Sequence, residues 1–124
     1  MGQKKTIPIT AEVTTTDNAW TTLATLAISA NCVMMLKDIF VVGRDTVYAE
    51  MASARAEHRA RRYSGALALV GNIVFLVTHN AGSDSNLATT NSRITVSGDN
   101  LLLQVRGVTG RTIAWYGGFT CVQN

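Results

Sequence analysis

The side chains that could support catalysis in this chain are few and widely spaced. They comprise two histidines, two cysteines and eight carboxylates among 124 residues. His58 lies among arginines, and neighbouring positive charge lowers the pKa of an imidazole. We therefore interpret His58 as part of a solvated, charged face and not as an acid or base.

A metal site would need three or four ligands close together. His79 lies in a polar loop, HNAGSDSN, that we expect to be exposed and mobile, and Asp84 follows five residues later. That pair has no third ligand in its vicinity. Cys32 and Cys121 are far apart and belong to no CxxC motif, so we predict that both are buried, small apolar side chains without a disulfide. We expect no metal and no cofactor.

Motifs for covalent or phosphate chemistry are also missing. The sequence contains no Gly-x-Ser-x-Gly element of the kind that presents a serine nucleophile. Gly107 and Gly110 lie between two predicted strands, and no helix N-terminus follows them to supply amide groups to a phosphate. We predict that the protein is not an enzyme.

The net charge of +3 is concentrated in one arginine cluster. Such a cluster can neutralise phosphates, but two glutamates interrupt it and no known nucleic-acid motif accompanies it. Arginines also pair well with carboxylates of a neighbouring chain. We therefore predict an oligomer interface, and no nucleic acid, at Arg55, Arg59, Arg61 and Arg62.

Three aromatic residues offer two interpretations. Trp20, Trp115 and Tyr116 can form a platform on which a sugar stacks, or they can anchor the core, which is the more usual role of a tryptophan in an alternating strand. Tyr116 falls on the opposite side of its strand from Trp115. It is the candidate for an outward-facing contact.

The elements that must position these residues are predicted to be strands. The chain has 47% apolar and 15% charged residues and sixteen threonines, which favour strands and a polar, weakly charged exterior. A chain of this length closes one core. It has no secretory signal and no membrane-spanning apolar run, so we expect synthesis and folding in a cytoplasm without membrane contact.

Residues 1–10 are predicted to form an extended arm ahead of a domain of residues 11–124. Pro8 excludes a central strand but permits an edge segment. Such an arm packs on its own domain or binds a partner. If it binds a partner, the contact residues are Lys4, Lys5, Ile7 and Ile9.

The end of the chain gives the clearest pattern. Residues 101–105 and 113–116 are short apolar runs, and residues 106–111 between them contain two glycines that can adopt positive φ. We predict that the two runs pair as a β-hairpin. Ile113 and Trp115 then share one face, which needs a second sheet to cover it.

These residues carry a family resemblance. The pattern V-S-G-D-N-L-x-x-x-V-x-G-x-x-G-R-T-I-x-W, over residues 96–115, resembles the end of a small β-sandwich domain of bacteriophage tail-fibre and tail-spike proteins and related head decoration proteins. Upstream, Thr14-Thr15-Thr16-Asp17, Val41-Val42-Gly43-Arg44 and Ala68-Leu69-Val70-Gly71 follow in the order expected of that domain. The resemblance covers residues 13–122.

The middle of the chain is ambiguous. Residues 46–62 have strong helix propensity and some helical spacing, whereas a period of two puts alanines on one face and charged residues on the other. The sequence pattern predicts a turn at residues 43–45 after residues 32–42. The resemblance implies that residues 46–62 form a strand antiparallel to residues 32–42, and we predict that strand. Residues 67–77 are a strand pair or one strand bent at Gly71-Asn72.

The fold expected is all-β: one antiparallel, jelly-roll-like sandwich of about 7–9 strands.

The resemblance implies a non-enzymatic virion protein, commonly a homotrimer, assembled in the host cytoplasm. Because the chain offers only a short arm and no shaft, we expect a capsid decoration or cement protein that binds the major capsid protein or another virion protein. The alternative is a tail-fibre tip or receptor-binding protein that recognises host surface glycans. A cellular lectin-like module is a third class.

Overall fold

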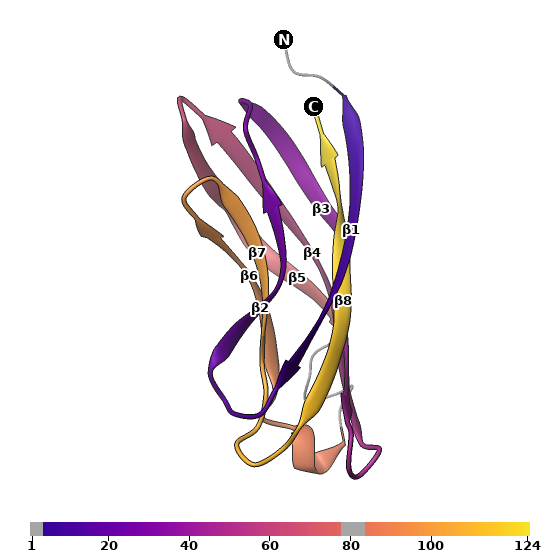
Figure 1. Ribbon diagram of the computed structural model, residues 1–124. Helices are drawn as coiled ribbons and strands as arrows, with labels where there is room; N and C mark the ends of the chain where they lie inside the picture. The colour runs from indigo at the N-terminus through magenta and orange to yellow at the C-terminus, as the bar shows by residue number, and fades with distance from the viewer. Residues whose placement is uncertain (1–3, 78–83) are drawn as a thin grey trace.

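Two antiparallel β-sheets pack face to face and enclose one core (Figure 1). The computed structural model describes residues 4–77 and 84–124, and only the backbone of residues 72–77. The all-β sandwich predicted from the sequence is confirmed. The elements are β1 (Lys5–Thr15), β2 (Trp20–Ala27), β3 (Cys32–Asp45), β4 (Met51–Tyr63), β5 (Ala66–Val77), the short 3-10 helix η1 (Ser85–Leu87), β6 (Asn91–Ser97), β7 (Asn100–Arg106) and β8 (Ile113–Gln123).

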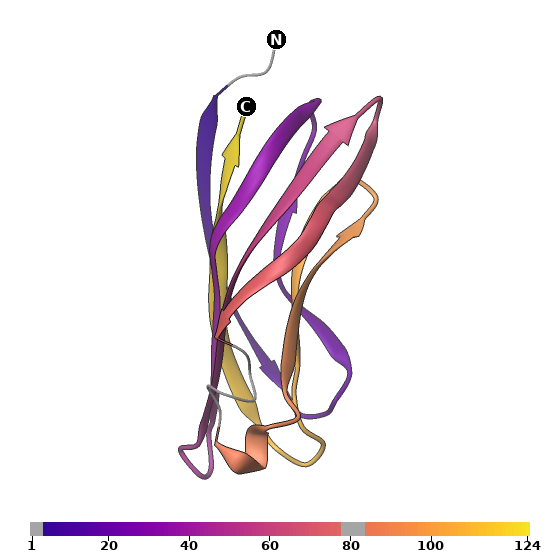
Figure 2. The ribbon, with the colours of Figure 1, turned by 180° about the vertical axis from the view of Figure 1, so that it is seen from behind.

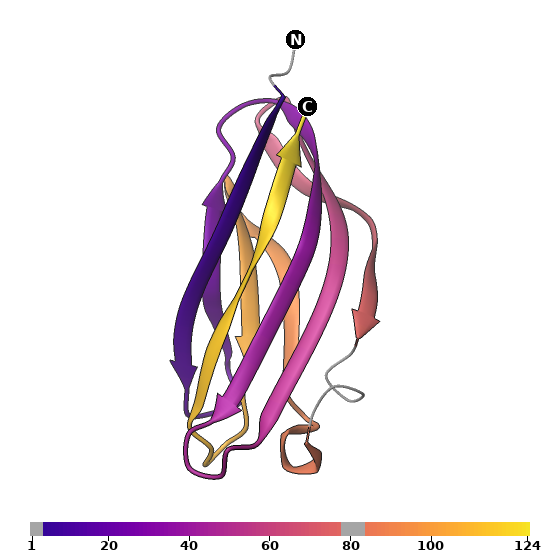
Figure 3. The same cartoon turned by 90° about the vertical axis from the view of Figure 1, so that its right-hand side faces the viewer.

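The two sheets differ in width. The larger has the strand order β1-β8-β3-β4-β5 and the smaller β2-β7-β6. Figure 3 views the outer face of the larger sheet, with the smaller sheet behind it, and Figure 2 views the molecule from the side opposite to Figure 1. The start of β1 and the end of β8 lie at one end of the sandwich (Figure 1). Each sheet therefore has one face on the core and one face outward.

Trp115, near the start of β8, is one of the largest fully buried side chains of the core. Its side chain is 1% exposed, and its Nε1 donates a hydrogen bond to Thr15 Oγ1 at 2.9 Å. Gly43 lies opposite it on β3, where a Cβ atom would come within 2.6 Å of the indole ring. Gly43 therefore leaves the space that the indole fills, and the predicted turn at residues 43–45 is wrong, since β3 continues to Asp45.

The predicted hairpin between residues 101–105 and 113–116 is also wrong. Both segments are strands, but β7 pairs with β2 and β6 in the smaller sheet, whereas β8 pairs with β1 and β3 in the larger one. The tight turn is the two-residue connection Gly98-Asp99 between β6 and β7, with Gly98 at φ 57°. Residues 107–112 instead carry the chain from one sheet to the other.

The ambiguous segment is a strand. β4 runs antiparallel to β3 over most of its length, as the resemblance implied. Its four even-numbered alanines, Ala52, Ala54, Ala56 and Ala60, are buried against the smaller sheet. β5 is one strand, with Gly71 at φ 75° where the pairing with β4 shifts. Tertiary pairing thus outweighs the helix propensity of alanine.

The described part of the predicted arm packs on its own domain. β1 runs from Lys5 through residue 10 without a break and pairs with β8 along its whole length, from Lys5 opposite Gln123 to Thr15 opposite Ile113. It is an edge strand, which is where a sheet tolerates Pro8. The boundary expected at residue 10 therefore falls inside one element.

A buried ionic cluster fixes the opposite end of the sandwich. Asp45 is fully buried, and its carboxylate accepts hydrogen bonds from the amides of Val47 and Tyr48 and from Arg111 at 3.0 Å. Arg111 also bonds Glu50 at 2.8 Å. Burial alone raises the pKa of Asp45, but the amide donors and Arg111 outweigh it, so the net pKa lies below its ordinary value. The cluster joins the β3–β4 loop to the β7–β8 crossover.

Candidate interaction surface

The outer face of the five-stranded sheet, whose strands lie toward the viewer in Figure 3, is the candidate interaction surface. It combines exposed apolar and aromatic side chains with arginines. We call this surface the broad face. Its large apolar and aromatic residues include Val33 at 57% exposure, Met35 at 43%, Val42 at 42%, Tyr63 at 75% and Tyr116 at 46%. Protein interfaces are enriched in tyrosine, methionine and arginine relative to other surface. The face thus has the composition of a contact surface.

Three arginines of the predicted cluster lie in a row along this face. Arg55, Arg59 and Arg61 are exposed on β4. In the register with β3 they stand opposite Phe40, Met35 and Val33 respectively. Among residues 4–77 and 84–124, no ion pair engages any of the three. Their charges are therefore available to a partner.

Arg62 departs from the predicted cluster. Its side chain is 14% exposed, pairs with Asp99 at 2.8 Å, and donates a hydrogen bond to the carbonyl of Ile28. It thus ties β4 to the β6–β7 turn and to the segment after β2. Arg62 shares the even numbering of the inward alanines, and this parity could have placed it correctly from the sequence.

Two shallow depressions flank Val33 and Arg61. One, of about 470 Å³, is lined by Met35, Arg59 and Val122 among others, and the other, of about 700 Å³, by Tyr63 and Ala68 among others. Both are lined largely by apolar atoms, with arginines among the lining residues. Largely apolar depressions beside arginines can receive protruding side chains of another protein.

The structure places Tyr116 on the broad face. Its ring lies 5.6 Å from that of Phe40 at an interplanar angle of 59°. Tilted aromatic pairs at this separation are favourable beyond their buried area. The contact holds the tyrosine ring against the sheet, while 46% of the residue stays exposed. The exposed part of the ring is therefore already positioned for contact with a partner.

His58 is buried, so the predicted solvated face is wrong for this residue. It is 6% exposed, and its Nδ1 has no hydrogen-bond partner. Burial first, and then the positive charge of Arg59, lowers the pKa of His58. The direction expected from the arginines is thus correct, with burial as the larger cause. His58 is a neutral core side chain at neutral pH.

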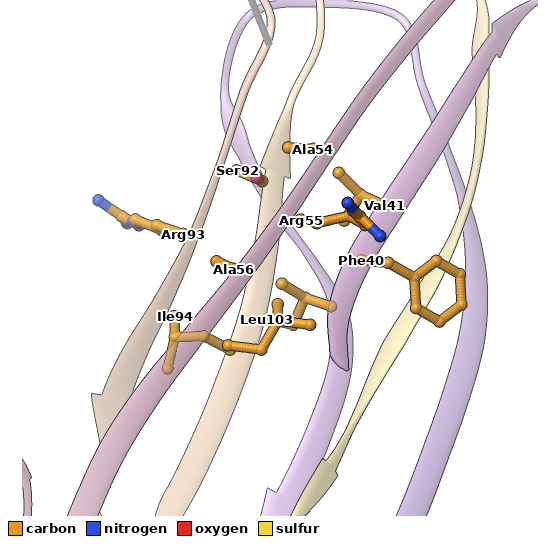
Figure 4. Close-up of a pocket in the computed structure, with 10 residues that line it drawn as sticks. Phe40, Val41, Ala54, Arg55, Ala56, Ser92, Arg93, Ile94 and Leu103 are labelled. Atoms are coloured by element: carbon orange, nitrogen blue, oxygen red, sulfur yellow. The ribbon is translucent and has the colours of Figure 1, made fainter. Parts of the chain in front are cut away.

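The space between the sheets offers no room for a substrate at the position drawn in Figure 4. It measures about 10 Å³, close to the space of one water molecule. Val41 and Ala56 from the larger sheet and Ile94 and Leu103 from the smaller one line it. Arg93 points away from it, outward from the smaller sheet (Figure 4).

The remaining chemistry-bearing residues lie apart. Cys32 and Cys121 are free thiols, but only Cys121 is buried as predicted, whereas Cys32 is partly buried. Burial raises the pKa of both thiols. Asp84 accepts a hydrogen bond from the Met51 amide at 2.7 Å, whereas its predicted neighbour His79 lies outside the described residues. Within the described part of the chain, no three metal-ligating side chains gather, and no helix is long and apolar enough to span a membrane.

The outer face of the three-stranded sheet carries a second cluster. The guanidinium carbon of Arg93 lies 4.1 Å from the ring centroid of Trp20, and that of Arg106 lies 5.0 Å from it. Trp20 is thus not a core anchor, unlike Trp115. Arg93 Nε donates to Gln104 Oε1 at 2.8 Å, and Gln104 Nε2 donates to Thr22 Oγ1 at 3.2 Å.

The arm residues proposed for partner binding divide into two kinds. Lys4 and Lys5 are exposed, whereas Ile7 and Ile9 pack against the core.

Sequence reasoning missed the exposed apolar residues Val33, Met35 and Val42. Exposed and buried residues alternate along β3, and the exposed positions change from odd to even numbers at the bulge at residues 37–38. It also missed Arg93 and Arg106, which only the strand register brings to Trp20.

No protein-family model and no curated protein matches this sequence. Among solved structures, the chain is similar to the tailspike protein of Acinetobacter baumannii phage AM24, with a TM-score of 0.46 and 14% sequence identity. The match covers 95% of this chain and 26% of the tailspike chain. The chain thus spans about a quarter of the length of that protein.

Proposed function

We propose that this protein is a non-enzymatic structural protein of a bacteriophage virion, which assembles through its broad face. The observation that carries the proposal is the row of Arg55, Arg59 and Arg61 interleaved with exposed Val33 and Met35. The phage setting comes from the sequence resemblance over residues 13–122. Within that setting, a homotrimeric decoration or cement protein on the head is the place we assign to it.

Burial of this face in an assembly is favourable for two reasons. The exposed apolar side chains leave water, at about 25 cal/mol per Å² of apolar surface. The arginines meet carboxylates of a neighbouring subunit, where a guanidinium forms two parallel hydrogen bonds. Apolar burial supplies affinity, and the arginine spacing supplies specificity for the partner.

The edge strand β1 offers a second contact to the head lattice. Its side chains Ile7 and Ile9 serve the core, so the anchoring role is limited to Lys4, Lys5 and the outward backbone groups of β1. An exposed strand edge can pair with a strand of another protein through main-chain hydrogen bonds. Pro8 removes one donor from β1 and so restricts which register such a partner can adopt.

Copy number in the particle tests the placement. In particles purified from the phage that encodes the protein, quantitative mass spectrometry should find hundreds of copies per virion for a head decoration protein. Met35→Lys should reduce the amount retained on particles, because it adds a second positive charge beside Arg59 on a surface that the assembly would bury. A matched Thr25→Lys change on the other sheet should not. Normal retention of Met35→Lys would reject the broad face as the assembly surface.

A tail-fibre tip or receptor-binding protein is the second candidate. The observation that favours it is the Trp20–Arg93–Arg106 cluster, which faces away from the broad face and stays free if that face is buried. A few to a few tens of copies per virion, together with adsorption to host cells by the isolated protein, would support this candidate over head decoration.

A further inference from the structure

The outer face of the three-stranded sheet is positively charged without compensation from its own strands. β2, β6 and β7 contain the arginines Arg93 and Arg106 and no aspartate or glutamate. Asp99, in the turn between β6 and β7, pairs with Arg62 instead. Among the described residues no ion pair engages Arg93 or Arg106. Two positive charges thus share one sheet face.

The strand register brings both charges to one ring. Trp20 on β2 stands directly opposite Arg106 on the central strand β7. Arg93 lies on β6, opposite Gln104, and reaches across β7 to the same indole. A guanidinium over an aromatic face is held by the ring quadrupole. The hydrogen bond from Arg93 Nε to Gln104 fixes its orientation further.

This arrangement holds the two guanidinium groups ready for an anion. No carboxylate of the described residues forms an ion pair with either guanidinium, so an anion bound there would meet two positive charges. The Nε of Arg93 is occupied by Gln104, which leaves its terminal nitrogens to donate to a ligand. Because the side chains are already positioned, little conformational entropy is lost on binding.

The surroundings indicate a ligand that is both anionic and rich in hydroxyl groups. Thr22, Thr25 and Asn91 are exposed on the strands around the cluster, and Gln104 lies between the arginines. Hydroxyl and amide side chains exchange hydrogen bonds with sugar hydroxyls. A nucleic acid would instead need a free aromatic face for base stacking, and Arg93 lies over the Trp20 ring.

We propose that the Trp20–Arg93–Arg106 cluster binds carboxylate groups of an acidic polysaccharide. The arginines hold the carboxylates, and the Gln104–Thr22 pair contacts neighbouring hydroxyls. Trp20 is a positioning residue, since it holds the guanidinium groups. This site is separate from the broad face, and it does not depend on the assembly proposed above.

Isothermal titration calorimetry with four probes tests the site: oligogalacturonate, polysialic acid, a neutral dextran oligomer and a single-stranded oligonucleotide. The full-length protein should bind at least one acidic glycan, more weakly as salt increases, and should not bind dextran. Arg93→Gln and Arg106→Gln should each weaken that binding about tenfold or more, because a charge-assisted hydrogen bond is lost. Arg55→Gln and Arg59→Gln remove the same charge from the broad face and serve as matched controls.

Three results would overturn the proposal. They are no binding of either acidic glycan, equal loss from the broad-face variants, or tighter binding of the oligonucleotide than of both acidic glycans. Circular dichroism of each variant checks that the β-sheet fold is retained. If the broad-face variants lose assembly but keep glycan binding, the site stands whatever the outcome for the proposed function.

Discussion

The absence of a side chain at Gly43 allows the Trp115 ring to pack in the core. Its position opposite Trp115 leaves no space for a Cβ atom, which would lie 2.6 Å from the indole. We predict that Gly43→Ala destabilises the protein by about 1–3 kcal/mol, because overpacking forces side chains from their preferred rotamers. Urea unfolding measures the change. Val42→Ala, at the adjacent exposed position, is the control, and an equal loss there would refute the role of Gly43.

Asp45 makes stability sensitive to acid. Its pKa is lowered in the folded state, so its stabilising contribution is present above the unfolded pKa of about 4 and is lost as pH falls through the folded value. We predict that Asp45→Asn lowers stability at neutral pH and flattens the acid dependence below about pH 4. Urea unfolding across a pH series measures both effects. Glu12→Gln, an exposed carboxylate on β1, should leave the acid dependence unchanged.

His58 acts in a different pH range. Its pKa is lowered by burial, so the unfolded chain binds the proton first, and stability falls as pH drops below about 6.5. We predict that His58→Leu reduces the loss of stability between about pH 7 and pH 5, because the variant lacks the buried imidazole that protonates more readily in the unfolded chain. Thermal unfolding at both pH values is the measurement. An unchanged difference between the two would show that His58 is solvated when folded.

At the scale of elements, one face of β4 is buried in the core and the other face is exposed. Ala56 faces a space of only about 10 Å³, whereas its neighbour Arg55 faces outward on the broad face. We predict that Ala56→Leu destabilises the protein by about 1–3 kcal/mol through overpacking. Arg55→Ala should change stability by no more than about 0.5 kcal/mol. Chemical denaturation compares them, and the reverse ranking would mean that the strand faces the other way.

The sequence predicted strands well and their partners poorly. Alternation in residues 46–62 put the alanines on one face, and the structure buries that face in the core. Pairing of β7 with β8 could not be excluded locally, since residues 107–112 contain the same glycines that a hairpin uses. Whether the chain turns back at residues 107–112 or crosses to the other sheet depends on core contacts between residues distant in sequence. One such contact joins Trp115 to Thr15, 100 residues away.

At the scale of the whole molecule, the proposed functions rest on two faces of different chemistry. The broad face carries arginines among exposed apolar residues, and the smaller face carries two arginines at a tryptophan among hydroxyl and amide groups. The arginine cluster on β4 was visible in the sequence because its members are close in the chain. The second cluster was not, because Trp20, Arg93 and Arg106 come from three strands.

Size-exclusion chromatography with multi-angle light scattering measures assembly through the broad face most directly. We expect a concentration-dependent species of three times the 13.3 kDa chain mass. We further expect that Met35→Lys shifts this species to monomer, while Thr25→Lys on the opposite sheet leaves it intact. A wild-type protein that stays monomeric at all concentrations, or a trimer insensitive to Met35→Lys, would contradict assembly through the broad face.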